Sequence, residues 1–279
     1  MFPLNLGFMQ GRLSPMENGK IQSFPWKYWQ EEFFLSSQIN LSLMEWTLDQ
    51  EGLYSNPLLA PEGQKEILRL SKKFNLSIPS LTGDCFMQEP FWKAKKEKRK
   101  ILENDFSNII KASNEIGIKF IVVPLVDNGA VENEMQNEIL VSFLESLHPL
   151  LDALEIKILF ESDFSPNELK TFILQFNPNY FGINYDIGNS ASLGHNPIDE
   201  FSAYGAHILN VHIKDRLYLG STVPLMQGDA NFEQIFTLLD QFNYKGNCIF
   251  QTARAKDNNH IGVMKTYINQ IEAVYKSLI

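Results

Sequence analysis

The chain has 279 residues, of which 33 are Asp or Glu and 24 are Lys or Arg, so its formal net charge at pH 7 is −9. Hydrophobic residues make up 44% of the chain and charged residues 20%, and this near-average composition excludes a disordered or collagen-like protein. The acidic balance argues against an extended nucleic-acid-binding face, which needs many Lys and Arg contacts to phosphate. The length suits one large domain, since α/β barrels often contain about 250 residues.

The cysteine content and the apolar stretches bear on the compartment. Cys85 and Cys248 are too few for a disulfide framework in a chain of this size, which fits a reducing cytoplasm. The first residues, MFPLNLGFMQGR, lack the basic lead and long apolar stretch of a signal peptide. The most apolar later region, residues 139–160, is interrupted by Glu, His, Pro, Asp and Lys. We therefore expect a cytoplasmic protein with neither a signal peptide nor a membrane span.

Short apolar runs bounded by polar residues recur along the chain, and each is followed by a longer segment with helical spacing. The eight predicted strands are Leu4–Met9, Leu41–Trp46, Ser77–Leu81, Phe120–Pro124, Lys157–Glu161, Phe181–Asp186, Leu209–His212 and Asn247–Gln251. Runs such as FIVVP and KILF are continuously apolar, as parallel strands covered on both faces are. Eight such units without a composition break favour an α/β fold with a single (β/α)8 TIM barrel over residues 1–279, rather than a doubly wound sheet.

Helix starts are marked between the strands. Ser165 is a predicted N-cap that Glu168 completes as a capping box, and Asn196 predicts another helix start before a proline. The longest stretches without periodicity, residues 11–25 and 217–231, both follow strands. They are therefore expected on the face of the barrel where enzymes place substrate loops.

Polar side chains end each of the last four predicted strands. They are Glu161, Asp186, His212 and Gln251. Because the carboxyl ends of parallel strands face the mouth of a barrel, these side chains are expected to converge on one point. Oxygen ligands with one imidazole suit a divalent ion such as manganese, magnesium, cobalt or zinc. Any one of them alone would more often cap a loop or form an ion pair, and it is the register on four strands that favours a metal site.

The sequence resembles the xylose isomerase-like barrels, a superfamily of sugar and sugar-phosphate isomerases and epimerases. The likeness covers nearly the whole chain and rests on GFMQGRLSP, LMEW, VVPLVDN, FES, YDIGN and VHIKD at successive strands. In members that act on ketoses, the positions matching Glu161, Asp186 and His212, with a Glu on the eighth strand, hold a divalent metal. The resemblance implies that sugar oxygens bind this ion while two Glu residues on opposite sides of the sugar move a carbon-bound proton.

The chain departs from the family pattern at two positions. Gln251 stands where the family has the eighth-strand Glu, and Asn189 stands where a His often follows the sixth-strand Asp. Gln251 can offer its carbonyl oxygen to a metal, but an amide cannot act as a base near neutral pH. We therefore expect weaker metal binding than with a full carboxylate set, and a metal-free variant stays open.

Residues near the ends of other strands are expected to shape the substrate pocket. Those predicted to bind substrate are Arg12, Glu45, Asp84, Lys214, Arg216 and Arg254. Guanidinium groups offer fixed donors to a hydroxyl, carboxylate or phosphate, and structural ion pairs or caps are the alternatives. Arg12 and Glu45 are candidates for such a pair, because an unpaired buried carboxylate is costly.

The sequence thus predicts a sugar or sugar-phosphate isomerase or epimerase, with Glu161 as the base, Gln251 as a second catalytic residue and a divalent metal polarising the carbonyl. A lyase or dehydratase acting on a polyol ketone is the alternative within enzymes. A carbohydrate-binding barrel that lost its chemistry with the eighth-strand Glu is the alternative from another class. The expected partner is a small-molecule sugar or sugar phosphate, with neither nucleic acid nor membrane, and self-association into a homo-oligomer stays open.

Overall fold

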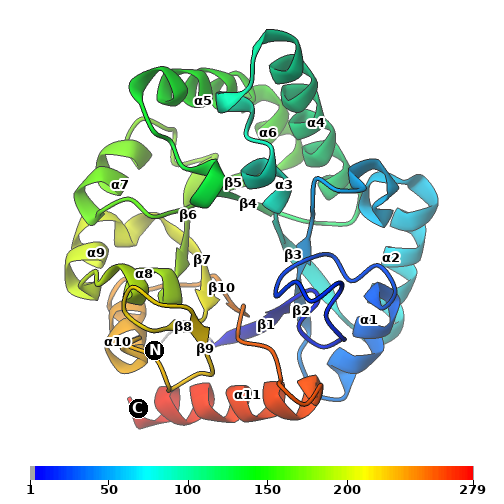
Figure 1. Ribbon diagram of the computed structural model, residues 1–279, viewed down its shortest axis with the longest axis vertical. Coiled ribbons are helices and arrows are strands. Elements are labelled where there is room, and N and C mark those ends of the chain that lie inside the picture. The colour runs from blue at the N-terminus through cyan, green and yellow to red at the C-terminus, as the bar shows by residue number, and fades with distance from the viewer. Residues whose placement is uncertain (1–3, 279) are drawn as a thin grey trace.

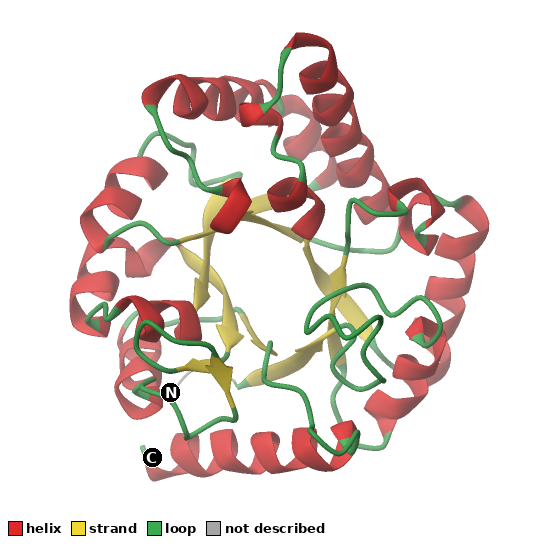
Figure 2. Cartoon of the chain, in the orientation of Figure 1, coloured by secondary structure: helices red, strands yellow, loops and turns green. Residues whose placement is uncertain are grey.

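The computed structural model describes residues 4–278, and its centre is a closed barrel of parallel strands inside a ring of helices (Figure 1, Figure 2). The barrel strands are β1 (Asn5–Met9), β2 (Leu43–Thr47), β3 (Ser77–Thr82), β4 (Phe120–Leu125), β5 (Lys157–Ser162), β6 (Phe181–Asp186), β7 (Ile208–Ile213) and β10 (Asn247–Phe250). Their order around the barrel follows the chain, and β1 pairs with both β2 and β10. Strands from both ends of the described chain therefore close the barrel, which confirms the predicted fold.

The helices lie outside the barrel, and several short ones lie in the connections. The α-helices are α1 (Trp29–Ser37), α2 (Pro61–Phe74), α3 (Asp84–Gln88), α4 (Lys96–Glu115), α5 (Glu134–Ser146), α6 (His148–Leu154), α7 (Pro166–Ile173), α8 (Ile187–Leu193), α9 (Pro197–Tyr204), α10 (Phe232–Gln241) and α11 (His260–Ser277). Strands β8 (Asp215–Arg216) and β9 (Thr222–Val223) form a small antiparallel hairpin after β7. Within residues 4–278, none of the helices is both long enough and apolar enough to cross a membrane.

The predicted strands are confirmed, with ends that differ by two residues at most. The largest difference is in the second strand, which was predicted over residues 41–46 and lies at Leu43–Thr47. The predicted helix starts are also confirmed. Ser165 and Glu168 form a capping box at the start of α7, and the side chain of Asn196 accepts a hydrogen bond from the backbone of Ile198 at the start of α9.

Alternation along the strands separates the packing face from the site face. Phe160 of β5 contacts Phe172 of α7, with ring centroids 5.0 Å apart, and stacks on Phe181 of β6. Burying one such side chain stabilises the fold by roughly 1.5–3 kcal/mol. Because neighbouring side chains point to opposite faces of a strand, Glu161 points into the barrel while Phe160 fixes the helix outside it.

Candidate active site and metal centre

The carboxyl ends of the strands open into a cavity of about 250 Å³ at the mouth of the barrel. Its lining includes Glu161, Lys214, Gln251, Gln22 and Asp84. A larger groove of about 850 Å³ lies at the other end of the barrel, beside β1, β2 and α11, and contains none of the predicted site residues. The candidate chemistry is therefore concentrated at the mouth, which is where barrel enzymes have their active sites.

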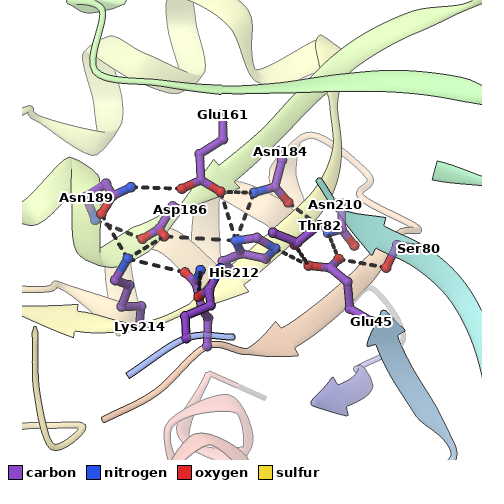
Figure 3. Close-up of polar contacts among 12 residues, drawn as sticks. Glu45, Ser80, Thr82, Glu161, Asn184, Asp186, Asn189, Asn210, His212 and Lys214 are labelled. Atoms are coloured by element: carbon purple, nitrogen blue, oxygen red, sulfur yellow. Dashed lines mark hydrogen bonds and ion pairs between the residues drawn. The ribbon is translucent and has the colours of Figure 1, made fainter. Parts of the chain in front are cut away.

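Glu161, Asp186 and His212 bring ligand-type atoms together at this mouth (Figure 3). One atom from each lies within 4.8 Å of the others. Nδ1 of His212 is 3.0 Å from Oε2 of Glu161 and 4.0 Å from Oδ2 of Asp186. All three residues are buried on neighbouring strands: Asp186 is the last residue of β6, and Glu161 and His212 are the last but one of β5 and β7. Two carboxylate oxygens and an imidazole nitrogen at this spacing suit a divalent cation.

A second carboxylate, that of Glu45, contacts the other ring nitrogen of His212. Oε1 of Glu45 is 2.7 Å from Nε2 of His212, and both side chains are fully buried (Figure 3). The carboxylate also accepts hydrogen bonds from Ser80, Thr82 and Asn210. Burial opposes a charge on the imidazole, but the facing carboxylate of Glu45 raises the pKa of His212 above its ordinary value. Because Glu45 holds Nε2, the other ring nitrogen, Nδ1, faces Glu161 and Asp186. Carboxylates commonly orient metal-binding imidazoles in this way.

Two amides orient the carboxylate of Glu161. Asn184 donates from Nδ2 to Oε2 over 2.8 Å, and Asn189 donates from Nδ2 to Oε1 over 2.9 Å. The side-chain oxygen of Asn184 accepts in turn from Asn210. With a donor on each oxygen, the carboxylate of Glu161 is held in one orientation at the lining of the cavity.

Lys214 connects Asp186 with Gln251. Its Nζ atom is 3.1 Å from Oδ2 of Asp186 and 3.3 Å from Oε1 of Gln251, and it also contacts Asn189. The other oxygen of Asp186 accepts from the backbone of Asn189 and so caps α8. Because an ammonium group can only donate, the contact fixes which end of the Gln251 amide is its oxygen. The side-chain oxygens of Gln251 and Asp186 therefore both face the ammonium group of Lys214.

Two of the three predicted arginines, Arg216 and Arg254, lie in different surroundings. Arg216 lines the cavity, where it donates to Oδ1 of Asn189 over 2.9 Å and to the backbone carbonyl of Gly220. Arg254 lies outside the cavity lining and donates to the backbone carbonyl of Ser14. Only Arg216 of these two is therefore in a position to meet a ligand in the cavity.

The predicted pair of Arg12 and Glu45 is wrong. Arg12 belongs to the loop after β1 and donates to Oε1 of Gln22 over 3.1 Å, whereas Glu45 lies inside the barrel and pairs with His212. Burial and the charge of the nearby Arg254 lower the pKa of Arg12 to about 9. Glu45 does not line the cavity, so this placement puts it behind the imidazole rather than against a substrate.

Gln22 is a residue of the site that the sequence analysis missed. Its Nε2 atom donates to Oδ2 of Asp84 over 2.7 Å, and its Oε1 atom accepts from Nε2 of Gln251 over 2.8 Å. Gln22 lies in an aperiodic part of the loop between β1 and α1. The only signal for its role was the position of this loop after a strand.

Glu32 of α1 fixes the path of that loop. The backbone amides of Gly11, Leu13 and Ser14 donate to its carboxylate over 2.7 Å, 2.9 Å and 3.1 Å. Glu32 is fully buried. Three backbone donors on one buried carboxylate hold the first part of the loop that brings Gln22 to the mouth.

Comparisons with known proteins agree with this architecture. A family model described as a xylose isomerase-like TIM barrel matches residues 35–271. A Haemophilus influenzae protein named "Putative L-ribulose-5-phosphate 3-epimerase SgbU" is 23% identical to the chain over an alignment of 235 residues that covers 78% of this chain and 81% of that protein.

Two solved structures are similar over nearly their whole length. D-psicose 3-epimerase from Clostridium cellulolyticum H10, solved with D-tagatose, has a TM-score of 0.75 at 10% identity, covering 97% of this chain and 99% of the other. A xylose isomerase-like TIM barrel protein from Mycobacterium smegmatis, in complex with magnesium, has a TM-score of 0.70 at 14% identity, covering 98% and 97%. These two likenesses show a shared fold, and the family match spans most of the sequence. The chain therefore belongs to the xylose isomerase-like TIM barrel family.

Proposed function

We propose that the protein is a sugar or sugar-phosphate isomerase or epimerase that moves a proton on a carbon next to a carbonyl. The observation that carries this proposal is the convergence of Glu161, Asp186 and His212 at the mouth of a barrel of this family. The Haemophilus relative and the Clostridium structure are named for 3-epimerisation of a ketose phosphate and of a ketose. These names support ketoses and their phosphates as the substrate class.

The same three residues would hold a divalent ion, and their chemistry fits one. Two carboxylates and an imidazole within 4.8 Å of one another suit manganese, magnesium, cobalt or zinc. His212 has to release a proton before Nδ1 can act as a ligand, so binding of the ion is expected to release protons. A bound ion would polarise the carbonyl of the sugar. Gln251 adds only a neutral oxygen near this position, which favours a lower affinity than a fourth carboxylate would.

Glu161 is proposed as the base that takes the carbon-bound proton. Asn184 and Asn189 hold its carboxylate at the cavity, and a positioned base of this kind typically contributes about 10²–10⁴-fold to a rate. Lys214 and Arg216 line the same cavity and offer charged donors. These two side chains are proposed to bind the hydroxyl or phosphate groups of the substrate.

Deuterium exchange tests the proposal. Protein stripped of metal with a chelator is incubated in D₂O with D-psicose, D-tagatose or L-ribulose 5-phosphate, with and without Mg²⁺, Mn²⁺, Co²⁺ or Zn²⁺. We expect proton NMR to show loss of a carbon-bound proton from at least one sugar, at a rate that falls on metal removal and recovers on metal addition. Absence of exchange with every sugar and every metal contradicts the proposed function.

A carbohydrate-binding barrel without catalysis is the second candidate, and Gln251 is the observation that favours it, because the site lacks one carboxylate of the family. This candidate predicts that the same sugars raise the melting temperature of the protein while no carbon-bound proton exchanges. Exchange in the experiment above excludes it.

We also propose that the protein works in the cytoplasm. Cys85 and Cys248 are both buried free thiols, as is usual for proteins that fold in a reducing compartment. Measuring the distribution of the tagged protein between cell fractions tests this location.

A further inference from the structure

We propose that Asp84 is the second proton-carrying residue of this site and delivers a proton to the bound sugar on the side away from Glu161. The inference rests on the proposed function, because inversion of a carbon next to a carbonyl needs a base on one side and an acid on the other. Gln251 cannot be that acid, since a neutral amide does not ionise near neutral pH.

Burial separates the acids that reach the cavity. In the described part of the chain, the carboxylic residues lining it are Asp84, Asp127, Glu161 and Asp163. Asp127 and Asp163 are exposed, whereas Asp84 is 5% and Glu161 is 6% exposed. An exposed carboxyl exchanges its proton freely with water, while a buried one can hold a proton for a substrate. Asp84 is therefore the acid that remains once Glu161 is assigned as the base.

The hydrogen bonds of the two buried acids differ in number. Glu161 receives a donor on each oxygen, from Asn189 and from Asn184. Asp84 receives Nε2 of Gln22 on Oδ2 over 2.7 Å, and among residues 4–278 no hydrogen bond reaches its Oδ1 atom. No ion pair with Asp84 occurs among these residues either. Each oxygen of Glu161 thus has an amide donor, whereas within the described chain Oδ1 of Asp84 has none and is free to meet a ligand.

The electrostatic surroundings of Asp84 favour its protonated form. Burial raises the pKa of Asp84 to about 7, and the charges of Asp49 and Glu161 act in the same direction, against the hydrogen bond from Gln22 and the positive charge of Arg12. Near neutral pH a substantial fraction of the protein then carries a proton on Asp84. A buried carboxyl that holds its proton near neutral pH can serve as the acid of a site.

The two groups also enter the cavity from different strands. Asp84 begins α3 directly after β3, and Glu161 lies on β5, with β4 between them in the barrel. Gln22 holds Oδ2 of Asp84 on the side of the loop that follows β1. Asp84 and Glu161 therefore reach the same cavity from β3 and β5, two strands that are not neighbours in the barrel.

The proposed step balances without an oxidant or reductant. The carboxylate of Glu161 removes the proton from carbon, and the electron pair of the C–H bond forms the C=C bond of an enediolate, whose oxygen takes the negative charge. The carboxyl of Asp84 then gives its proton to the same carbon from the other side, so that a new C–H bond forms and the carbonyl is restored. Glu161 ends protonated and Asp84 ionised, and proton exchange with water restores both.

The test compares Asp84→Asn with a matched variant outside the site. Asp105 is buried on α4 and accepts a hydrogen bond from Tyr54, so Asp105→Asn makes the same change away from the cavity. D-psicose, D-tagatose and L-ribulose 5-phosphate are incubated with each metal-loaded protein in D₂O, starting from either epimer of the pair. Epimer formation and deuterium content are measured separately, and melting temperatures report on folding.

We expect Asp84→Asn to slow epimer formation by about 100-fold or more, while deuterium still enters the epimer whose proton faces Glu161. Asp84→Glu should recover part of the epimerisation, and Asp105→Asn should match the wild type. Epimer formation by Asp84→Asn within about threefold of wild type would overturn the inference. Equal loss of exchange from both epimers in a folded Asp84→Asn variant would also overturn it.

The two proposals fail in different ways. A wild-type protein without exchange contradicts the proposed function, and the inference about Asp84 falls with it. A wild type that exchanges, beside an Asp84→Asn variant that epimerises normally, contradicts the inference alone. Infrared difference spectra of wild type against Asp84→Asn give a readout that needs no turnover. A protonated carboxyl band at pH 6 that is missing in the variant supports the inference, and its absence from wild type opposes it.

Discussion

Two walls of the barrel mouth differ in how their charges are arranged. On the wall formed by β5, β6 and β7, Glu161, Asp186 and His212 lie within 4.8 Å of one another and are surrounded by donors. On the wall formed by β3 and the loop after β1, Asp84 is the buried acid and its hydrogen bond comes from the amide of Gln22. The acids of the first wall suit a cation, whereas on the second wall burial and the charges of Asp49 and Glu161 favour a proton on Asp84.

A line of hydrogen bonds joins the two walls. Lys214 donates to Oε1 of Gln251, Gln251 donates to Oε1 of Gln22, and Gln22 donates to Asp84. Every donor in this line points from the ammonium toward the carboxyl. Since each amide has its orientation set by its neighbour, a change of charge at one position is expected to be felt along the line.

The largest effect is expected from neutralising Glu161, the proposed base on the first wall. Glu161→Gln keeps the shape of the side chain but removes the proton acceptor, so we expect solvent deuterium exchange to fall by about 10²–10⁴-fold. Proton NMR in D₂O measures it, and Glu138→Gln on the exposed face of α5 serves as the matched control. Unchanged exchange in Glu161→Gln would remove this residue from the role of base.

The second wall can be tested through the pH dependence of stability. Burial raises the pKa of Asp84 from 3.8 to about 7, so the unfolded chain loses this proton first as pH rises. Unfolding then releases a proton, and stability falls between about pH 4 and pH 7 by at most about 1.4 kcal/mol per pH unit. Asp84→Asn removes this contribution.

Urea unfolding at pH 4 and pH 8 gives the comparison for Asp84→Asn. From pH 4 to pH 8, the free energy of unfolding of the variant is expected to rise by about 3 kcal/mol relative to that of the wild type. Stability curves that stay parallel across this range would contradict a proton held on Asp84 in the folded protein.

The contact that orients His212 on the first wall is tested at Glu45. Glu45→Gln leaves an amide where a carboxylate accepts from His212, Ser80, Thr82 and Asn210. We expect divalent-metal affinity to fall by about 10–100-fold, because the imidazole loses the group that orients it. Calorimetry of metal binding measures the effect against Glu138→Gln, and equal affinities would show that the imidazole needs no such support.

Most of the fold could be predicted because the barrel repeats one pattern. Continuous apolar runs mark the strands, and β6 lies at the predicted residues, Phe181–Asp186. The hairpin of β8 and β9 could not be predicted, since each of its strands has only two residues. Short helices such as α3, inside a connection, carry no hydrophobic periodicity that a sequence pattern can detect.

The site could be predicted only where its residues end strands. Asn184 and Asn210 were treated as parts of strands, although each lies two residues before a site residue, on the same inward face of its strand. Alternation read from Asp186 and His212 would have found both. Gln22 had no such signal, because its position depends on the path of a loop that contacts distant in the sequence determine.

The smallest expected effect is at Gln251, which lies between the two walls and contacts Lys214 and Gln22. Gln251→Glu places a carboxylate beside Lys214 and close to Asp186, so an added negative charge should tighten metal binding by about tenfold, or about 1.4 kcal/mol. Two local effects oppose this gain. The ammonium of Lys214 would pair with the new carboxylate, and the hydrogen bond that Gln251 donates to Gln22 would be lost.

A second substitution separates these effects. Lys214→Met removes the competing cation, so the double variant with Gln251→Glu should bind Mn²⁺ more tightly than Gln251→Glu alone, as measured by calorimetry. The loss at Gln22 is common to both proteins and cancels in this comparison. If neither variant binds Mn²⁺ more tightly than wild type, Gln251 does not face the ion. The metal would then depend on Glu161, Asp186 and His212 without a fourth ligand from β10.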